Sequence, residues 1–205
     1  MAAGDTGISI CADALILLGA SPISSFNDGT DESNACDRLY PDVRDSTLVM
    51  YPWSFATKKI QLARLIDAPN SVWSYAYALP GDRLSNPSAA YQSSAVSSSV
   101  QKNWEVQGDQ LLTDMDAVFI DYKYSCPEYL MPQYFVQLLK YMMAWHLAEP
   151  ITEQMDKGLN WRRVAIGEPG ENGRGGYFRT AAQIDGQGNP SRAINDFTLV
   201  ESRFS

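Results

Sequence analysis

The chain begins with apolar residues at helical spacing. In "GISICADALILLGA", Cys11 and Leu15 fall on one face of an α-helix with other apolar residues. Asp5 or Thr6 suits the N-terminal cap, and Gly19 stands where a left-handed C-terminal cap is favoured. The pattern predicts a first helix that ends at Gly19, followed by a turn-rich linker, "SPISSFNDGT".

A second helical pattern starts near Asp31 and includes Cys36 and Val43. Pro41 lies inside it. Because proline lacks the amide hydrogen that a helix interior uses, we expect a kink or a break there. Pro52 stops the pattern, and "WSFATKKIQLARL" predicts a third, shorter helix with this proline in its first turn.

From about residue 70 the spacing changes to the alternation typical of strands. In "AVFIDYKYS", Ile120 and Tyr122 face one way and Asp121 faces the other. The tetrapeptide "QGDQ" at 107–110 predicts a hairpin turn, because its glycine can take a positive φ. Between the strands, the serine-rich "SNPSAAYQSSAVSSSV" predicts a long exposed loop or a flexible hairpin tip.

Helical spacing returns in "PQYFVQLLKYMMAWHLAEP". Its broad apolar face, which includes Phe135, Leu139 and Met143, predicts a central and mostly buried helix that Pro150 ends. The next segment, "ITEQMDKGLNWRRVAI", predicts one more helix with Thr152 as its cap.

These elements predict a mainly α fold with a β insertion, of the α+β class. We expect a helical bundle at 1–69 and 127–166, a small antiparallel β subdomain at 70–126, and an extended C-terminal arm at 167–205. The arm is glycine-rich, yet it carries many large apolar residues, which a solvated tail rarely does. They are Tyr177, Phe178, Ile184, Ile194, Phe197, Leu199, Val200 and Phe204. The arm is therefore expected to order against its own core or against a partner subunit.

Charge and hydropathy limit the partners. The formal net charge is −8, which argues against tight, sequence-independent binding of DNA, since that needs many cations facing phosphates. The longest strongly apolar run, "ALILLGA", is far too short for a membrane span, so no membrane partner is expected. The start "MAAGDTG" lacks the basic region of a secretory signal, and we expect a protein made in the cytoplasm.

The residue types that commonly act in catalysis show no spacing typical of an active site. His146, the one histidine, would have to serve as the base of a Ser-His-Asp or Cys-His site, but it lies in the most buried helix, where a packed histidine is expected. Cys11, Cys36 and Cys126 are odd in number and widely spaced, which predicts buried free thiols. "DMD" at 114–116 predicts a solvated turn, and "GENGRGG" lacks the strand and helix that a phosphate cradle needs. We expect no enzymatic activity, cofactor or metal.

Two basic clusters have aromatic neighbours. They lie within 53–64 and 161–163, and their cations include Lys58, Lys59, Arg162 and Arg163. Such clusters stack bases or bind phosphates in some proteins, so a nucleic-acid-binding accessory module is the alternative function. On an acidic chain, patches that form ion pairs between subunits are the preferred interpretation, and they contribute orientation more than affinity.

Four stretches together resemble one protein family. They are "ICADALILLGASPISSFNDGT", "ACDRLYPDVRDSTLVMYPWSFATKKIQLARL", "YAYALPGDRL" leading into "WEVQGDQLLTD", and the helix that ends "WHLAEPITEQ". In this order they are similar to the tail tubular protein A family, the head-to-tail adaptors of tailed bacteriophages. The resemblance covers about 7–157, and "AQIDGQGNPSRAINDFTLVESRFS" also resembles the family's C-terminal arm. The serine-rich insertion at 85–103 and the glycine-rich 167–176 depart from the family pattern.

The resemblance implies a structural protein of the virion neck. Its members form a ring, usually of twelve subunits, docked beneath the portal protein, and the tail nozzle or tail tube assembles on the other side. Duplex DNA then passes through the lumen without specific binding, which an acidic wall favours because it repels phosphates. The interface residues that we expect are Lys58, Lys59, Arg162, Arg163, Phe178, Ile194, Phe197, Leu199 and Phe204.

The stretch "YPWSFATKK" lies where Pro52 is predicted to end one helix of the bundle and to open the next. We expect Trp53 and Phe55 to wedge the junction of the bundle, because large rings beside a proline suit a helix corner. Lys58 and Lys59 are expected on a surface that faces an acidic neighbouring subunit.

Overall fold

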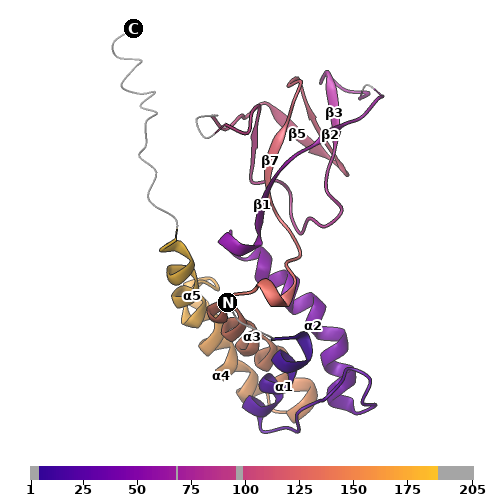
Figure 1. Cartoon of the computed structure of the whole chain (residues 1–205). Coiled ribbons are helices and arrows are strands. Elements are labelled where there is room, and N and C mark those ends of the chain that lie inside the picture. Colours follow the sequence, from indigo (N-terminus) through magenta and orange to yellow (C-terminus); the bar gives the residue numbers. More distant parts are fainter. Residues whose placement is uncertain (1–4, 68, 96–98, 189–205) are drawn as a thin grey trace, which may run out of the picture.

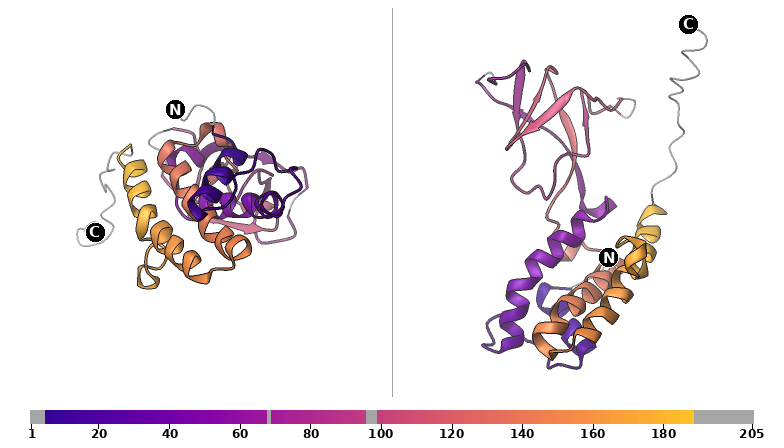
Figure 2. Two further views of the ribbon diagram at one scale, coloured as in Figure 1. Left: turned by 90° about the horizontal axis from the view of Figure 1, so that it is seen from below. Right: turned by 180° about the vertical axis from the view of Figure 1, so that it is seen from behind.

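Helices gather at one end of the molecule and strands at the other (Figure 1). This computed structural model describes residues 5–67, 69–95 and 99–188. The view from behind shows the same division (Figure 2, right). The predicted α+β class is confirmed: helices α1 to α5 accompany two small antiparallel sheets.

The first helix, α1 (Gly7–Leu18), has the predicted signals at both of its ends. Thr6 is the N-cap, and its hydroxyl accepts a hydrogen bond from the Ser9 amide while the Ser9 side chain bonds back to Thr6. Gly19 closes the helix with φ of 77°.

The second helix, α2 (Asp31–Val49), runs through Pro41 without interruption. A break at this proline, one of the two outcomes expected, is wrong. Tyr40 and Val43, on either side of the proline, are both buried in the core. Their packing holds the helix together although Pro41 cannot donate a backbone hydrogen bond.

The central helix, α3 (Gln133–Thr152), packs against α1, α2, α4 (Met155–Ile166) and α5 (Gly176–Gly186). Pro150 does not end it: the helix continues to Thr152 and stops at Glu153, which takes φ of 54°. The predicted cap is also wrong, because the Thr152 hydroxyl donates to the Ala148 carbonyl oxygen inside α3.

The stretch predicted as a third helix is a short 3-10 turn, Ser54–Ala56, followed by strands β1 (Thr57–Gln61) and β2 (Ala63–Arg64). The reason is tertiary. β1 pairs antiparallel with a strand far along the chain, and that ladder outweighs the local helical spacing. The strand-rich part therefore begins at Thr57 rather than near residue 70.

The strands form one three-stranded sheet, in the order β1-β7-β4, and one four-stranded sheet, in the order β2-β3-β6-β5. The remaining bounds are β3 (Tyr75–Ala78), β4 (Ala89–Tyr91), β5 (Trp104–Gln107), β6 (Gln110–Thr113) and β7 (Phe119–Lys123). Between β1 and β2 the chain crosses from one sheet to the other at the buried Leu62.

Two details of the β prediction are confirmed and one is wrong. Gly108 makes the turn between β5 and β6 with φ of 59°. In β7, Ile120 and Tyr122 are buried while Asp121 is less so. The serine-rich segment is not wholly an exposed loop, since it contains β4, whose Ala90 is buried.

The region predicted as an extended arm contains a short 3-10 turn, Pro169–Glu171, and a helix, α5 (Gly176–Gly186). An extended conformation is therefore wrong for 176–186. The helix forms because Phe178, Ala181 and Asp185 share one face that is buried against α4 and α3. The rest of the predicted arm, 189–205, lies outside the described residues.

Trp53 fills the junction between the helices and the sheets. Its side chain is fully buried, and its Nε1 donates to the Thr47 carbonyl oxygen at the end of α2. Its ring centroid lies 5.0 to 6.4 Å from those of Tyr51, Phe55, Tyr134, Phe135 and Phe178. The packing predicted for Trp53 and Phe55 is confirmed, but the corner joins α2 to strand β1 rather than to another helix. The Trp53 ring also connects this segment to α3 and α5.

Replacing Trp53 by alanine should lower the free energy of unfolding by about 3–5 kcal/mol, because it leaves a cavity among five rings. Trp73→Ala is the matched control. That indole is half-buried in the strand-rich part, and its Nε1 donates to the exposed Glu105 carboxylate, so its loss should cost about 1 kcal/mol or less. Urea unfolding followed by circular dichroism measures both, and equal losses would contradict the role of Trp53.

Candidate functional site

A buried carboxylate fastens α5 to the junction. Asp185 is 3% exposed, and its Oδ1 accepts from the Ser54 hydroxyl at 2.7 Å and from the Tyr134 hydroxyl at 2.6 Å. The Ser54 amide donates to Oδ2 at 3.0 Å. Burial, together with the hydrogen bond to Asp185, raises the pKa of the Tyr134 hydroxyl. Three donor groups thus satisfy this buried carboxylate and fix the position of α5.

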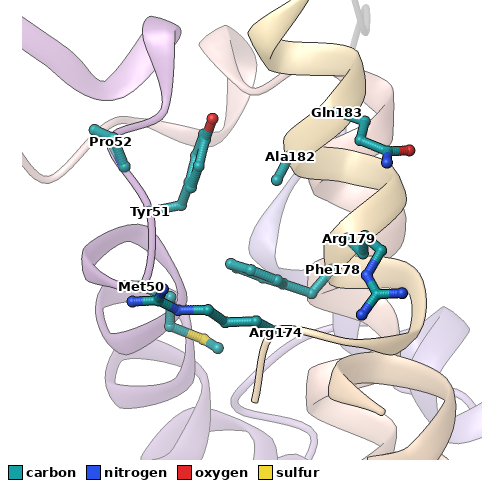
Figure 3. Close-up of a pocket in the computed structure, with 8 residues that line it drawn as sticks. All are labelled: Met50, Tyr51, Pro52, Arg174, Phe178, Arg179, Ala182 and Gln183. Atoms are coloured by element: carbon teal, nitrogen blue, oxygen red, sulfur yellow. The ribbon is translucent and has the colours of Figure 1, made fainter. Parts of the chain in front are cut away.

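Beside this junction lies the pocket shown in Figure 3. It has a volume of about 600 Å³ and is lined by Met50, Tyr51, Pro52, Arg174, Phe178, Arg179, Ala182 and Gln183. Tyr51, from the segment after α2, and Phe178, from α5, project into it from opposite walls, and the Arg174 side chain reaches toward Met50 (Figure 3). The pocket therefore combines an apolar floor with a cationic rim.

The two arginines of this pocket differ in their partners. Arg179 bonds to the Glu171 carboxylate at 2.9 Å. Arg174 is exposed, and no carboxylate in 5–67, 69–95 and 99–188 forms an ion pair with it. Arg174 is thus an available cation at the edge of an apolar pocket.

Lys58 and Lys59, both predicted at an interface, have acidic and aromatic partners in their own chain. Lys58 Nζ lies 3.4 Å from Asp82 Oδ2 and 3.5 Å from the centroid of the Tyr124 ring. Lys59 Nζ lies 3.6 Å from Asp121 Oδ1, directly across the β1–β7 ladder. The side chains of both lysines remain 43% exposed.

The second basic cluster is on α4, in the helical part. Arg163 bonds to the Glu168 carboxylate at 2.9 Å, and the Arg162 guanidinium lies 5.8 Å from the Trp145 ring centroid. The two predicted basic patches thus belong to different parts of the molecule (Figure 1), and each includes a residue that is paired within the chain. This arrangement does not favour the nucleic-acid-binding alternative.

Of the apolar interface residues predicted in the arm, only Phe178 lies within the described part of the chain. It is 4% exposed and packs edge-on against Trp53, with 5.9 Å between centroids. Phe178 therefore belongs to the chain's own core, and only its pocket-facing edge is open to a ligand. Ile194, Phe197, Leu199 and Phe204 lie outside the described residues.

His146 and the three cysteines are at least half-buried. His146 is half-buried beside Trp145, and burial lowers its pKa. It lines a smaller cavity of about 330 Å³ with Met155 and Leu159. The three cysteines are buried and unbridged, as predicted. Within the described ranges, no group of three His, Cys, Asp or Glu side chains is placed to hold a metal ion.

No helix in the described part of the chain is long and apolar enough to cross a bilayer.

Sequence reasoning missed Asp185 and Arg174. Their roles depend on α5 folding back beside the end of α2, a contact between segments more than a hundred residues apart. The one available signal was the helical spacing of Phe178, Ala181 and Asp185 within a glycine-rich region. Gly176 shows why that region needs its glycines: a Cβ there would lie 2.7 Å from the Arg163 carbonyl oxygen.

Comparisons with known proteins add no assignment. The chain matches no protein-family model, and no curated protein matches it. The family resemblance therefore stays a prediction from the sequence.

The ion pair between Lys59 and Asp121 supports a charge-swap test. Lys59→Asp should lower the free energy of unfolding by up to about 1 kcal/mol, because two carboxylates then face each other across the ladder. Adding Asp121→Lys should recover part of that loss, because it restores the ion pair but removes the hydrogen bond that the Tyr91 hydroxyl donates to Asp121. Lys102→Asp changes the net charge equally at an exposed position and should shift stability by less than about 0.5 kcal/mol. Chemical unfolding measures all three, and a double variant no more stable than Lys59→Asp would contradict a direct pair.

Proposed function

We propose that the chain is a structural virion protein, a head-to-tail adaptor that forms a ring between the portal and the tail tube or nozzle. The ring has twelve copies in this proposal, and duplex DNA passes through its lumen. The order of the four resembling stretches supports it, and so does the combination of a helical bundle with a β-rich excursion. One observation carries it furthest: the molecule has two ends of different construction, and both expose large apolar side chains.

The strand end exposes the first of these groups. The loop between β2 and β3 lies at the tip of the strand-rich part (Figure 1), and it contains Ile66, which is 102% exposed, and Val72, which is 93% exposed. Large apolar side chains that are so fully exposed are suited to burial against a partner.

The helical end exposes the second group. The turn between α3 and α4 lies at the end of the bundle away from the sheets (Figure 1), and α4 begins there with Met155, which is 66% exposed. Leu159, one turn later, is 51% exposed. An adaptor needs two different exposed surfaces, because it contacts different partners at its two faces and uses heterologous contacts to close a ring.

The negative net charge of the chain supports the proposal that duplex DNA passes through the ring. At −8 per chain, a ring of twelve copies carries a strongly negative field, which repels phosphates and lets a duplex slide without adhering. The intrachain partners of Lys58, Lys59 and Arg163 are consistent with this, because they offset part of the positive charge that a phosphate would meet.

Charges placed on the strand-end loop test the proposal. Ile66→Asp with Val72→Asp should leave the melting temperature unchanged, since both side chains are exposed, but should weaken particle assembly. Burying a carboxylate at an interface costs about 2 kcal/mol or more, or roughly 30-fold in affinity. Infectivity of complemented particles measures the effect.

Val100→Asp is the matched control, because this valine is 53% exposed and lies outside the loop. It should leave assembly intact. Absence of the wild-type chain from purified particles would contradict the adaptor proposal, and so would equal infectivity of particles that carry the double variant and particles that carry the control.

A further inference from the structure

The pocket between α5 and the segment after α2 has the composition of a peptide site. Its floor is made by Tyr51, Phe178 and Ala182, and its volume of about 600 Å³ lies in the range that holds a small ligand or a large side chain. Arg174 supplies a cation at the rim whose charge no described carboxylate neutralises by an ion pair. An occupant that fits has an apolar group for the floor and a carboxylate beside it.

The chain itself supplies a segment with that chemistry. Residues 194–201 read "INDFTLVE", with apolar side chains from Ile194, Phe197, Leu199 and Val200. Asp196 and Glu201 bracket the main apolar run, and the segment holds no lysine or arginine. On a chain of net charge −8, an acidic segment is repelled from most of the surface and attracted to a site such as Arg174.

The segment can also reach the pocket within one molecule. From Phe178 to Gly188, two residues beyond the end of α5, the distance is about 15 Å at a helical rise of 1.5 Å per residue. The nine residues from Gly188 to Phe197 span up to roughly 30 Å when extended. The connection is therefore long enough to turn back along α5.

We propose that residues 194–201 dock in this pocket of their own chain. Phe197 packs against Tyr51 and Phe178 on the apolar floor, and the Asp196 carboxylate pairs with the Arg174 guanidinium. Docking keeps four apolar side chains of the segment from binding other copies until a stronger partner displaces them. This inference does not rest on the adaptor proposal, because the pocket and the segment belong to a single chain.

Photo-crosslinking in the full-length chain tests the inference. Benzoylphenylalanine in place of Phe197 should form crosslinks to the pocket walls, at 50–52 or 178–183, in a product of monomer mass whose yield does not change on dilution. Arg174→Glu should lower that yield by about tenfold, because it replaces an attraction by a repulsion. Arg174→Lys should retain it. Neither change should alter the melting temperature, since Arg174 is exposed.

The same photoreactive group in place of Phe204 is the matched control, because that phenylalanine lies outside 194–201. It should give a lower yield at the pocket. Crosslinks from position 197 that map elsewhere, or that appear only in dimers, would overturn docking within one chain. An unchanged yield in Arg174→Glu would also overturn it.

Discussion

Burial of the Trp53 indole is the constraint on which the rest of the structure depends. The chain leaves α2 and enters the sheets over a few residues, and this side chain fills the space between α2, α3 and α5 at that point. Its Nε1 hydrogen bond to Thr47 satisfies the one polar atom that burial would otherwise leave unpaired. The direction in which the strand-rich part departs from the bundle is therefore set by packing.

The polar counterpart of this packing is the Asp185 carboxylate. It accepts hydrogen bonds from Ser54 and Tyr134, so the turn before β1, the start of α3 and the end of α5 meet at one group. Lys123 adds a further link, because its Nζ donates to the Val49 carbonyl oxygen at the end of α2. Burial lowers the pKa of that lysine, yet its contact with a helix C-terminus favours the charged form. The apolar pocket beside α5 is a consequence of the same arrangement.

The sequence was sufficient where the signals are local. Thr6 and Gly19 bound α1 as capping chemistry predicts, and the glycine of "QGDQ" makes its hairpin. Prediction failed where contacts between distant segments determine the local structure. The 57–61 segment is a strand because β7 pairs with it. Helix α2 continues through Pro41 because the residues that flank the proline are buried. The pocket was not predictable, since no local pattern reveals that α5 folds beside Tyr51.

The proposed function rests on this two-part architecture and on the sequence resemblance. Its central claim is that the chain assembles into a ring. Averaged electron-microscopy images of the particle neck, viewed along the tail axis, test that claim most directly. The adaptor proposal predicts a twelvefold ring beneath the portal, and a label fused to this chain should appear in every subunit of it. A neck without such a ring, or a ring that never carries the label, would contradict it.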